Sequence, residues 1–272
     1  MSADNIARLN TIARKVRRDI LQMTAEAGGG HYMSSFSSVE LLVSLFFAEC
    51  RFNAQNPEDP DRDRFVLSKG HAAPLLYAVM AEAGYFPVGE LETLRRCGSR
   101  LQGHPIMHRL PGLDTSSGSL GQGISTAVGI ALAGKMDKRN YRVFVLLGDG
   151  ECQEGIVWEA AMSAAHFRLD NLVAIIDKNN LQISGPTEKV MSLGDLKSKW
   201  EAFGWTVIPV NGHDIENILA GFRKIPATKN KPVVLIADTI KGCGVPFIEN
   251  NLKYHTAPLN EEEMRTALEC LR

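Results

Sequence analysis

One stretch of this chain decides its fold: VFVLLGDGECQEG, at residues 143–155. Residues 143–147 are all apolar, and the run stops at Gly148-Asp149-Gly150. A short apolar run bounded by turn residues is typical of a strand that is buried on both faces of a parallel sheet. The carboxylate of Asp149, placed between two glycines at the end of that strand, is the feature that the surrounding sequence has to explain.

The sequence after this stretch alternates between helical patterns and apolar runs. Predicted strands cover 142–148, 171–177, 205–210 and 232–238, and predicted helices cover 154–167, about 195–203 and 214–224. Continuously apolar strands that alternate with helices predict an α/β fold, with a parallel sheet and helices on both of its faces.

The sequence before this stretch is mainly helical. Apolar residues recur at helical spacing over 4–27, and the glycines at 28–30 end that helix. The segment SSVE predicts a capping box before an apolar helix, with Ser37 as N-cap and Glu40 three residues later. A further helix, rich in small residues, is predicted at 120–136. We expect a single domain over residues 1–272, with this helical part packed on the sheet.

Composition excludes several classes of protein. The chain has 272 residues, a formal charge of -1, 44% hydrophobic and 22% charged residues, as in ordinary soluble domains. A basic excess that would suggest nucleic acid is absent, as is an apolar run near the roughly 18 residues of a membrane span. The five cysteines form no CxxC and no zinc spacing. We therefore expect reduced thiols and a cytoplasmic location, without a membrane or nucleic-acid partner.

Asp149 is predicted to have neighbours that suit a cation. Ligands of open α/β sheets bind beyond the carboxyl ends of the strands, and Asn179 and Asn180 follow the next predicted strand. Carboxylate, amide and loop carbonyl oxygens are hard donors that suit Mg²⁺ or Ca²⁺. A bound diphosphate would supply the remaining oxygens, and the glycines beside Asp149 let backbone N–H groups approach it. Each piece alone is also ordinary turn chemistry.

The combination of these motifs resembles a known family. GDG, then residues 151–178, then NN resembles the thiamine diphosphate (ThDP) motif. Moreover, FVLSKGHAAPLLYAVMAEAG, SSGSLGQGISTAVGIALA, GDGECQEGIVWEA and DKNNLQISG are similar, in the right order, to the N-terminal half of transketolase. The resemblance covers almost the entire chain and implies the diphosphate-binding (PP) domain of that fold.

The resemblance implies a role for each candidate residue. Asp149, Asn179 and the carbonyl of Leu181 would hold the divalent ion, and His71, Gly150, His255, Lys241 and Ser34 would contact the diphosphate. Gly118, Ser119 and Leu120 would line the aminopyrimidine and the central part of ThDP, while His31, His104 and His255 would bind sugar hydroxyls and move protons. Glu154 and Glu159 resemble glutamates that link paired active sites across a subunit interface, although a solvated helix face would look the same.

The chain also departs from the family. Transketolases often carry proline after the first of these histidines, where this chain has Tyr32 followed by Met33. Full transketolases are about twice as long, and their second half carries the pyrimidine-binding domain and most of the sugar-phosphate contacts. We therefore expect one subunit of a split transketolase, with the missing domains on a partner chain in an α2β2 heterotetramer.

Other functions remain open on the sequence alone. The chain could belong to a deoxyxylulose-phosphate synthase-like or 2-oxo acid dehydrogenase-like ThDP enzyme, although the latter should not carry these four histidines. A non-catalytic binding module or a metal-dependent phosphatase is also conceivable; the phosphatase would need a carboxylate cluster that Asp149 and Asp177 alone do not make. The ketose donor and the aldose acceptor are not chosen by this sequence.

Overall fold

A parallel sheet forms the centre of the chain, as predicted, and it has five strands where four were predicted. The computed structural model describes residues 3–272 and orders the strands β1-β2-β3-β7-β6. Their bounds are β1 Arg64–Leu67, β2 Val143–Gly148, β3 Leu172–Lys178, β6 Thr206–Asn211 and β7 Val233–Asp238. A separate antiparallel pair, β4 (Leu181–Gln182) and β5 (Gly185–Pro186), follows β3. The short edge strand β1 was not predicted, because its four residues lie directly after a polar loop.

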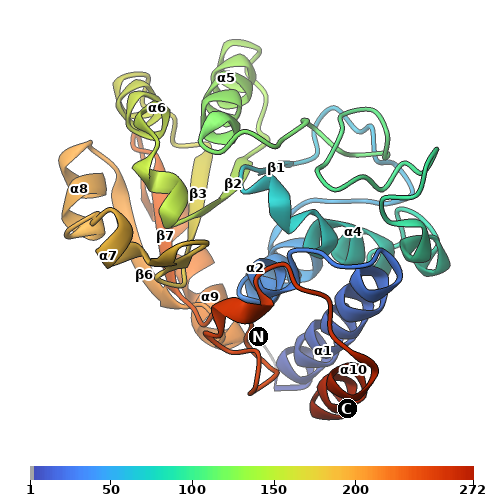
Figure 1. Cartoon of the computed structure of the whole chain (residues 1–272). Helices are drawn as coiled ribbons and strands as arrows, with labels where there is room; N and C mark the ends of the chain where they lie inside the picture. Colours follow the sequence, from blue (N-terminus) through green and yellow to red (C-terminus); the bar gives the residue numbers. More distant parts are fainter. Residues whose placement is uncertain (1–2) are drawn as a thin grey trace.

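Helices cover both faces of the sheet (Figure 1). One face packs against α1 (Ala3–Glu26), α2 (Tyr32–Phe36), α3 (Val39–Ser44), α4 (Ala73–Glu82) and α9 (Ile215–Phe222). The other packs against α5 (Gln122–Met136), α6 (Gly155–His166) and α8 (Leu196–Ala202). The short α7 (Thr187–Val190) follows β5, and α10 (Glu261–Cys270) packs beside α1. Within residues 3–272, no helix combines the length and the apolar character of a membrane span.

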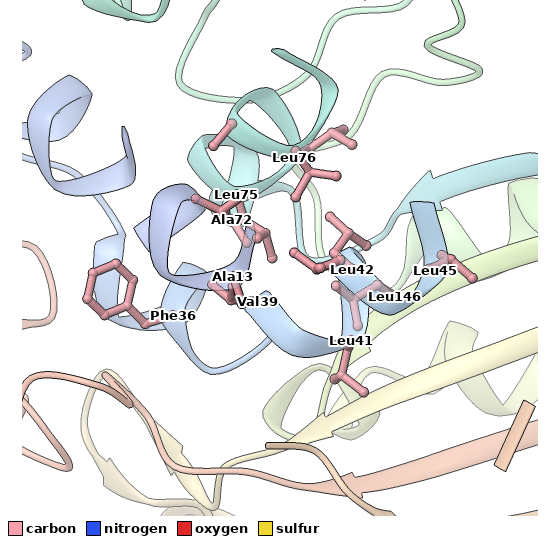
Figure 2. Packing of buried hydrophobic residues seen from close by; sticks show 14 of the residues in the cluster. Ala13, Phe36, Val39, Leu41, Leu42, Leu45, Ala72, Leu75, Leu76 and Leu146 are labelled. Atoms are coloured by element: carbon pink, nitrogen blue, oxygen red, sulfur yellow. The ribbon is translucent and has the colours of Figure 1, made fainter. Parts of the chain in front are cut away.

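The central strands are apolar up to their carboxyl ends because both of their faces are buried. Along β2, Phe144 and Leu146 contact the α1–α4 side, whereas Val143, Val145 and Leu147 contact the α5–α6 side. Figure 2 shows Leu146 in one cluster with side chains of α1, α2, α3 and α4. Each fully buried leucine of this kind contributes about 1.5–3 kcal/mol to stability. The hydrophobic effect therefore fixes the helical N-terminal part on the sheet.

The predicted capping box at 37–40 is wrong. The helix α3 begins at Val39, and the side chain of its N-cap, Ser38, makes no capping hydrogen bond. The hydroxyl of Ser37 instead donates to Asp177 Oδ2 at 2.6 Å, and the carboxylate of Glu40 accepts from the guanidinium of Arg17. Both side chains make charge-assisted bonds with distant residues, which are stronger than a local cap.

The parallel strands bring four loops to one edge of the sheet. Residues 68–72, 149–154, 179–187 and 239–242 follow β1, β2, β3 and β7 respectively, and these strands are consecutive neighbours in the sheet. The candidate functional residues lie mainly on these loops, as expected for ligand binding at the carboxyl ends of strands.

Candidate active site

A cavity of about 440 Å³ lies at this edge of the sheet. It is lined by most of the residues predicted for the site: His31, Ser34, His71, His104, Gly118, Leu120, Asp149, Gly150, Glu154, Asn179, Leu181, Lys241 and His255. Ser119 and Glu159 are exposed and are not among the lining residues. The structure therefore assembles the predicted site, apart from these two side chains.

Asp149 is a buried carboxylate that joins two neighbouring strand ends. Its Oδ1 accepts from the N–H of Gly150 at 2.8 Å, and its Oδ2 accepts from the N–H of Asn180 at 2.7 Å. Asn180 has a φ of +60°, a left-handed conformation that asparagine tolerates better than most residues. Burial, followed by the charge of Asp177, raises the pKa of Asp149 to about 6. A bound cation would stabilise the charged form of this carboxyl.

The other two predicted metal ligands lie beside Asp149 in the same cavity. The amide nitrogen of Asn179 donates to Asp177 Oδ2 at 3.0 Å, which orients the side chain, and its Oδ1 accepts from the N–H of Leu181 at 3.1 Å. The carbonyl of Leu181 accepts from the ammonium of Lys241 at 3.0 Å. Across residues 3–272, no three His, Cys, Asp or Glu side chains form a metal-binding group. A cation held here would therefore need further oxygens, such as those of a diphosphate.

A buried ion pair that the sequence analysis missed lies beneath these ligands. The ammonium of Lys69 donates to Asp177 Oδ2 at 2.6 Å, to Ser38 Oγ at 2.7 Å and to the carbonyl of Ser34 at 2.9 Å. Burial opposes the charge of Asp177, but Lys69 outweighs it and the pKa of Asp177 falls to about 2. The hydroxyl of Thr239 also donates to this carboxylate. The sequence signal for this pair was the position of its two charges: Lys69 lies just past the end of β1, and Asp177 lies at the end of β3.

Glu151 is a second buried residue that was missed. Its Oε1 accepts from Ser68 Oγ at 2.5 Å and from the N–H of Gly121 at 2.8 Å, and its Oε2 accepts from the N–H of Gly148 at 3.0 Å. Burial raises the pKa of Glu151. One carboxyl group thus joins the ends of β1 and β2 to the start of α5.

Three of the four candidate histidines form a cluster. The ring centroid of His31 lies 5.2 Å from that of His71 and 5.4 Å from that of His255. Burial is the main cause that lowers the pKa of His31 and of His255 to about 4, and it lowers the pKa of His71 well below its usual value. His104 is exposed at the rim, and its pKa is also lowered by partial burial. The clustered rings are therefore neutral near pH 7.

Several polar atoms in this cavity have no hydrogen-bond partner within the part of the chain that the structure describes. They are His31 Nδ1, His255 Nδ1 and Ser34 Oγ. Leaving a buried donor or acceptor unpaired costs about 1–3 kcal/mol, so such atoms indicate a polar ligand. The residues present fit a cofactor with a diphosphate and a substrate with hydroxyl groups.

Tyr32 and Met33, which depart from the family pattern, are buried and do not line the cavity. The Tyr32 hydroxyl donates to the carbonyl of Ala257 at 2.8 Å. Tyr32 directly follows His31, and Ala257 lies two residues after His255. Tyr32 therefore links the segments that carry His31 and His255, and neither Tyr32 nor Met33 places a side chain in the cavity.

These features define a thiamine diphosphate-binding domain: a parallel α/β sheet with a GDG aspartate, an NN segment and neutral histidines at one edge. The particular family follows from comparison with known proteins. Residues 9–271 match the family described as "Transketolase, thiamine diphosphate binding domain". The chain belongs to this family, which decides among the ThDP enzymes considered from the sequence.

The most similar relatives include separate transketolase subunits. One subunit of the apulose-4-phosphate transketolase from Phocaeicola vulgatus is 43% identical over 261 residues, which cover 94% of this chain and 92% of that protein. The 6-deoxy-6-sulfo-D-fructose transketolase subunit SqwG from a Clostridium species is also 43% identical, over 94% of this chain and 93% of its own length. The chain matches these subunits over nearly their whole length, and this match implies that it has a partner subunit.

Long-chain transketolases match as well, over part of their length. Human transketolase is 45% identical over 92% of this chain but only 40% of its own length. The solved transketolase from Campylobacter jejuni superposes with a TM-score of 0.92 and 32% identity, over 100% of this chain and 43% of the other. This chain therefore corresponds to less than half of a long-chain transketolase.

Proposed function

We propose that this chain is the diphosphate-binding subunit of a split transketolase, which transfers a two-carbon ketol unit from a ketose to an aldose. One observation carries the proposal: oxygen donors, a buried ammonium and neutral imidazoles line one cavity of a chain that matches a separate transketolase subunit over nearly its whole length. The proposed cofactors are ThDP and a divalent ion, Mg²⁺ or Ca²⁺.

The metal would bind to Asp149, Asn179 and the carbonyl of Leu181. These are hard oxygen donors, and oxygens of the ThDP diphosphate would complete the coordination. At present the ammonium of Lys241 donates to the Leu181 carbonyl. A cation at that oxygen would repel Lys241, whereas the diphosphate would offer it an anionic partner.

The rest of the cofactor would contact neighbouring loops. His71, Gly150 and Ser34 would bond the diphosphate, and Gly118 and Leu120 would line the central part of ThDP. A Cβ at Gly70 would lie only 2.9 Å from the backbone nitrogen of Gly118, so glycine allows these two loops to meet beside His71. Ser119 adopts an exposed position and would contribute through its backbone.

ThDP, when bound, supplies the carbanion chemistry that cleaves and forms the ketose carbon–carbon bond. The protein residues would bind and orient the sugar. A neutral imidazole can accept a proton from a hydroxyl and return it, so His31 and His255 suit general acid–base work, and His104 would bond the sugar at the rim. Glu154, exposed beside the cavity, would contact the partner subunit.

The partner subunit would carry the pyrimidine-binding domain, the glutamate that activates the cofactor and most of the sugar-phosphate contacts. The proposed assembly is an α2β2 heterotetramer. The substrates named for the two subunit relatives differ, an apulose phosphate and a sulfofructose, although both relatives are 43% identical to this chain. The substrate of this chain is accordingly a question for assays with its partner. The cysteines of residues 3–272 form no disulfide, and reduced thiols fit the proposed cytoplasmic location.

Titration calorimetry with Mg²⁺–ThDP tests the proposal. The chain alone should bind ThDP weakly, and a mixture with the partner subunit should bind it tightly and transfer ketol units. Asp238→Asn is a suitable control for site variants, because Asp238 lies at a neighbouring strand end but its side chain is 65% exposed. If ThDP binds neither sample, the site is not a ThDP site and a non-catalytic binding module becomes the better explanation.

A further inference from the structure

The segment that carries Lys241 is held on both sides of this residue. On one side, the N–H of Ile240 donates to Nε2 of His213 at 2.8 Å. On the other, the N–H of Gly242 donates to the carbonyl of Met33 at 3.1 Å. Lys241 projects into the cavity from between these two anchored peptide groups. The backbone from which the Lys241 side chain extends is therefore held in place near the proposed diphosphate position.

The bond from Ile240 also sets the state of the His213 ring. Because Nε2 accepts from a backbone N–H, its lone pair must be free, and Nδ1 then carries the hydrogen that points to Glu40 Oε2 at 3.0 Å. Burial lowers the pKa of His213, but contacts with Cys243 and Glu40 raise it to about 9, so these contacts taken alone favour the imidazolium. An imidazolium would, however, place its Nε2–H against the N–H of Ile240, and an amide N–H cannot become an acceptor. The bond from Ile240 is therefore made only by the neutral ring, which is the form that this arrangement requires.

The side chain of Glu40 is held in place by a residue of the N-terminal helix α1. The guanidinium of Arg17, on α1, donates to Oε1 and Oε2 of Glu40 at 2.5 and 2.8 Å, and both side chains are buried. Arg17 also donates through Nε to the carbonyl of Cys243 at 2.9 Å. Neither Arg17, Glu40 nor His213 lines the cavity. These three residues connect α1, α3 and the loop after β6 to the segment after β7.

We propose that His213 is a positioning residue for Lys241, so that it acts on cofactor binding through the backbone of Ile240. The inference rests on the proposed function, because it takes the diphosphate as the partner of Lys241. Ile240 is 38% exposed, so water can replace the imidazole in a variant, and the segment then gains conformational freedom. That freedom has to be lost again when the diphosphate binds, which weakens affinity.

Two substitutions of His213 separate the effect of losing the hydrogen-bond acceptor from the effect of losing the imidazole ring. His213→Ala removes the acceptor, whereas His213→Gln keeps an amide oxygen at about the distance of Nε2 and should restore the bond to Ile240. His166→Ala is the matched control, because His166 is an exposed histidine at the end of α6 on the other face of the sheet. All variants are made in the full chain and mixed with the partner subunit.

The measurements are the dissociation constant for Mg²⁺–ThDP, kcat at saturating ThDP, and hydrogen exchange of the cofactor-free chain. His213→Ala should weaken Mg²⁺–ThDP binding about ten-fold, as for one charge-assisted contact that is no longer held in place. It should speed exchange of the Ile240 and Gly242 amides and leave kcat at saturation within about two-fold. His213→Gln should recover most of the affinity, and His166→Ala should match the wild type.

Two results would overturn this inference: wild-type affinity in His213→Ala, whether or not its amides exchange faster, or an imidazolium at His213 in ¹⁵N spectra of the wild type at pH 7. The last measurement requires no variant, so it holds even if a substitution prevents folding. If the wild type itself fails to bind Mg²⁺–ThDP, the proposed function fails. If the wild type binds and His213→Ala binds equally well, only the role of His213 fails.

Discussion

Asp149 exemplifies a residue whose role could be predicted from its place in the chain. It follows one apolar strand and Asn179 follows the next, and parallel pairing of β2 with β3 brings the two together. Lys69 and Glu151 could not be paired in the same way. Lys69 contacts Asp177 across 108 residues of sequence, and Glu151 contacts Ser68 across 83 residues, so only the folded sheet identifies their partners.

Replacing Asp149 by asparagine should separate function from stability. The variant loses the only charged metal ligand proposed here, so Mg²⁺–ThDP binding should weaken by about a hundred-fold or more. The unfolding temperature of the cofactor-free chain should change little, because the amide removes a buried charge but its single oxygen can accept from only one of the N–H groups of Gly150 and Asn180. Calorimetry and thermal unfolding measure the two effects. Wild-type Mg²⁺–ThDP affinity in Asp149→Asn would contradict this account.

Tyr32→Phe tests whether the family departure positions His255. The substitution removes only the bond to the Ala257 carbonyl, worth about 1 kcal/mol, so KM for the ketose should rise about five-fold. Tyr141→Phe is the control, because the Tyr141 hydroxyl also donates to a carbonyl, that of Ile130, before β2 begins and away from the cavity. Equal KM changes in both variants would show that Tyr32 is merely structural.

At the scale of elements, the sequence predicts those helices and strands whose apolar residues recur with the period of their packing. The longer strands were predicted because both faces of the sheet are buried, which makes the central strands apolar up to their carboxyl ends. Helical periodicity predicted α1, α3, α5, α6, α8 and α9, whereas α2, α4 and α7 were not predicted. The strand β1 is too short to carry that signal, and the capping box at 37–40 failed because its two side chains serve distant charged partners. Local motifs are least reliable where tertiary contacts compete for the same side chain.

The contact between α1 and α4 should make stability depend on pH. Asp19 Oδ2 and Glu82 Oε1 are buried without hydrogen-bond partners in the described part of the chain, and burial, followed by Glu82, raises the pKa of Asp19 to about 7. The folded chain thus binds a proton more tightly than the unfolded one, whose aspartate pKa is about 3.9. This contribution to stability is complete below about pH 4 and is lost as pH rises through 7.

Asp19→Asn should remove that loss, because the amide donates permanently to Glu82. The variant should melt about 2 °C above the wild type at pH 8 and show no such gain at pH 5. The gain is small because the ammonium of Lys15 already pairs with Glu82 in the wild type. Thermal unfolding at both values of pH measures the difference. An equal shift at pH 5 and pH 8 would mean that Asp19 does not titrate with folding in this range.

At the scale of the whole molecule, the proposed function requires a partner subunit to complete the cavity. It opens beside Ile183, a residue that is 74% exposed in the turn between β4 and β5. An exposed apolar residue at the rim of the proposed cofactor site suits contact with the subunit that would enclose the cofactor. Burying such a side chain contributes about 1.5–3 kcal/mol, and a charge at that position would forfeit it.

Ile183→Glu should therefore weaken assembly with the partner subunit by at least about ten-fold and release ThDP with it. Met136→Glu is a matched control, because Met136 is also 74% exposed but lies at the end of α5 that points away from the cavity. Sedimentation of the mixed subunits, over a range of concentrations, measures both. Because the cofactor would lie between the subunits, ThDP affinity should recover at high partner concentration; weaker ThDP binding in a fully assembled complex would instead place Ile183 against the cofactor, not the partner.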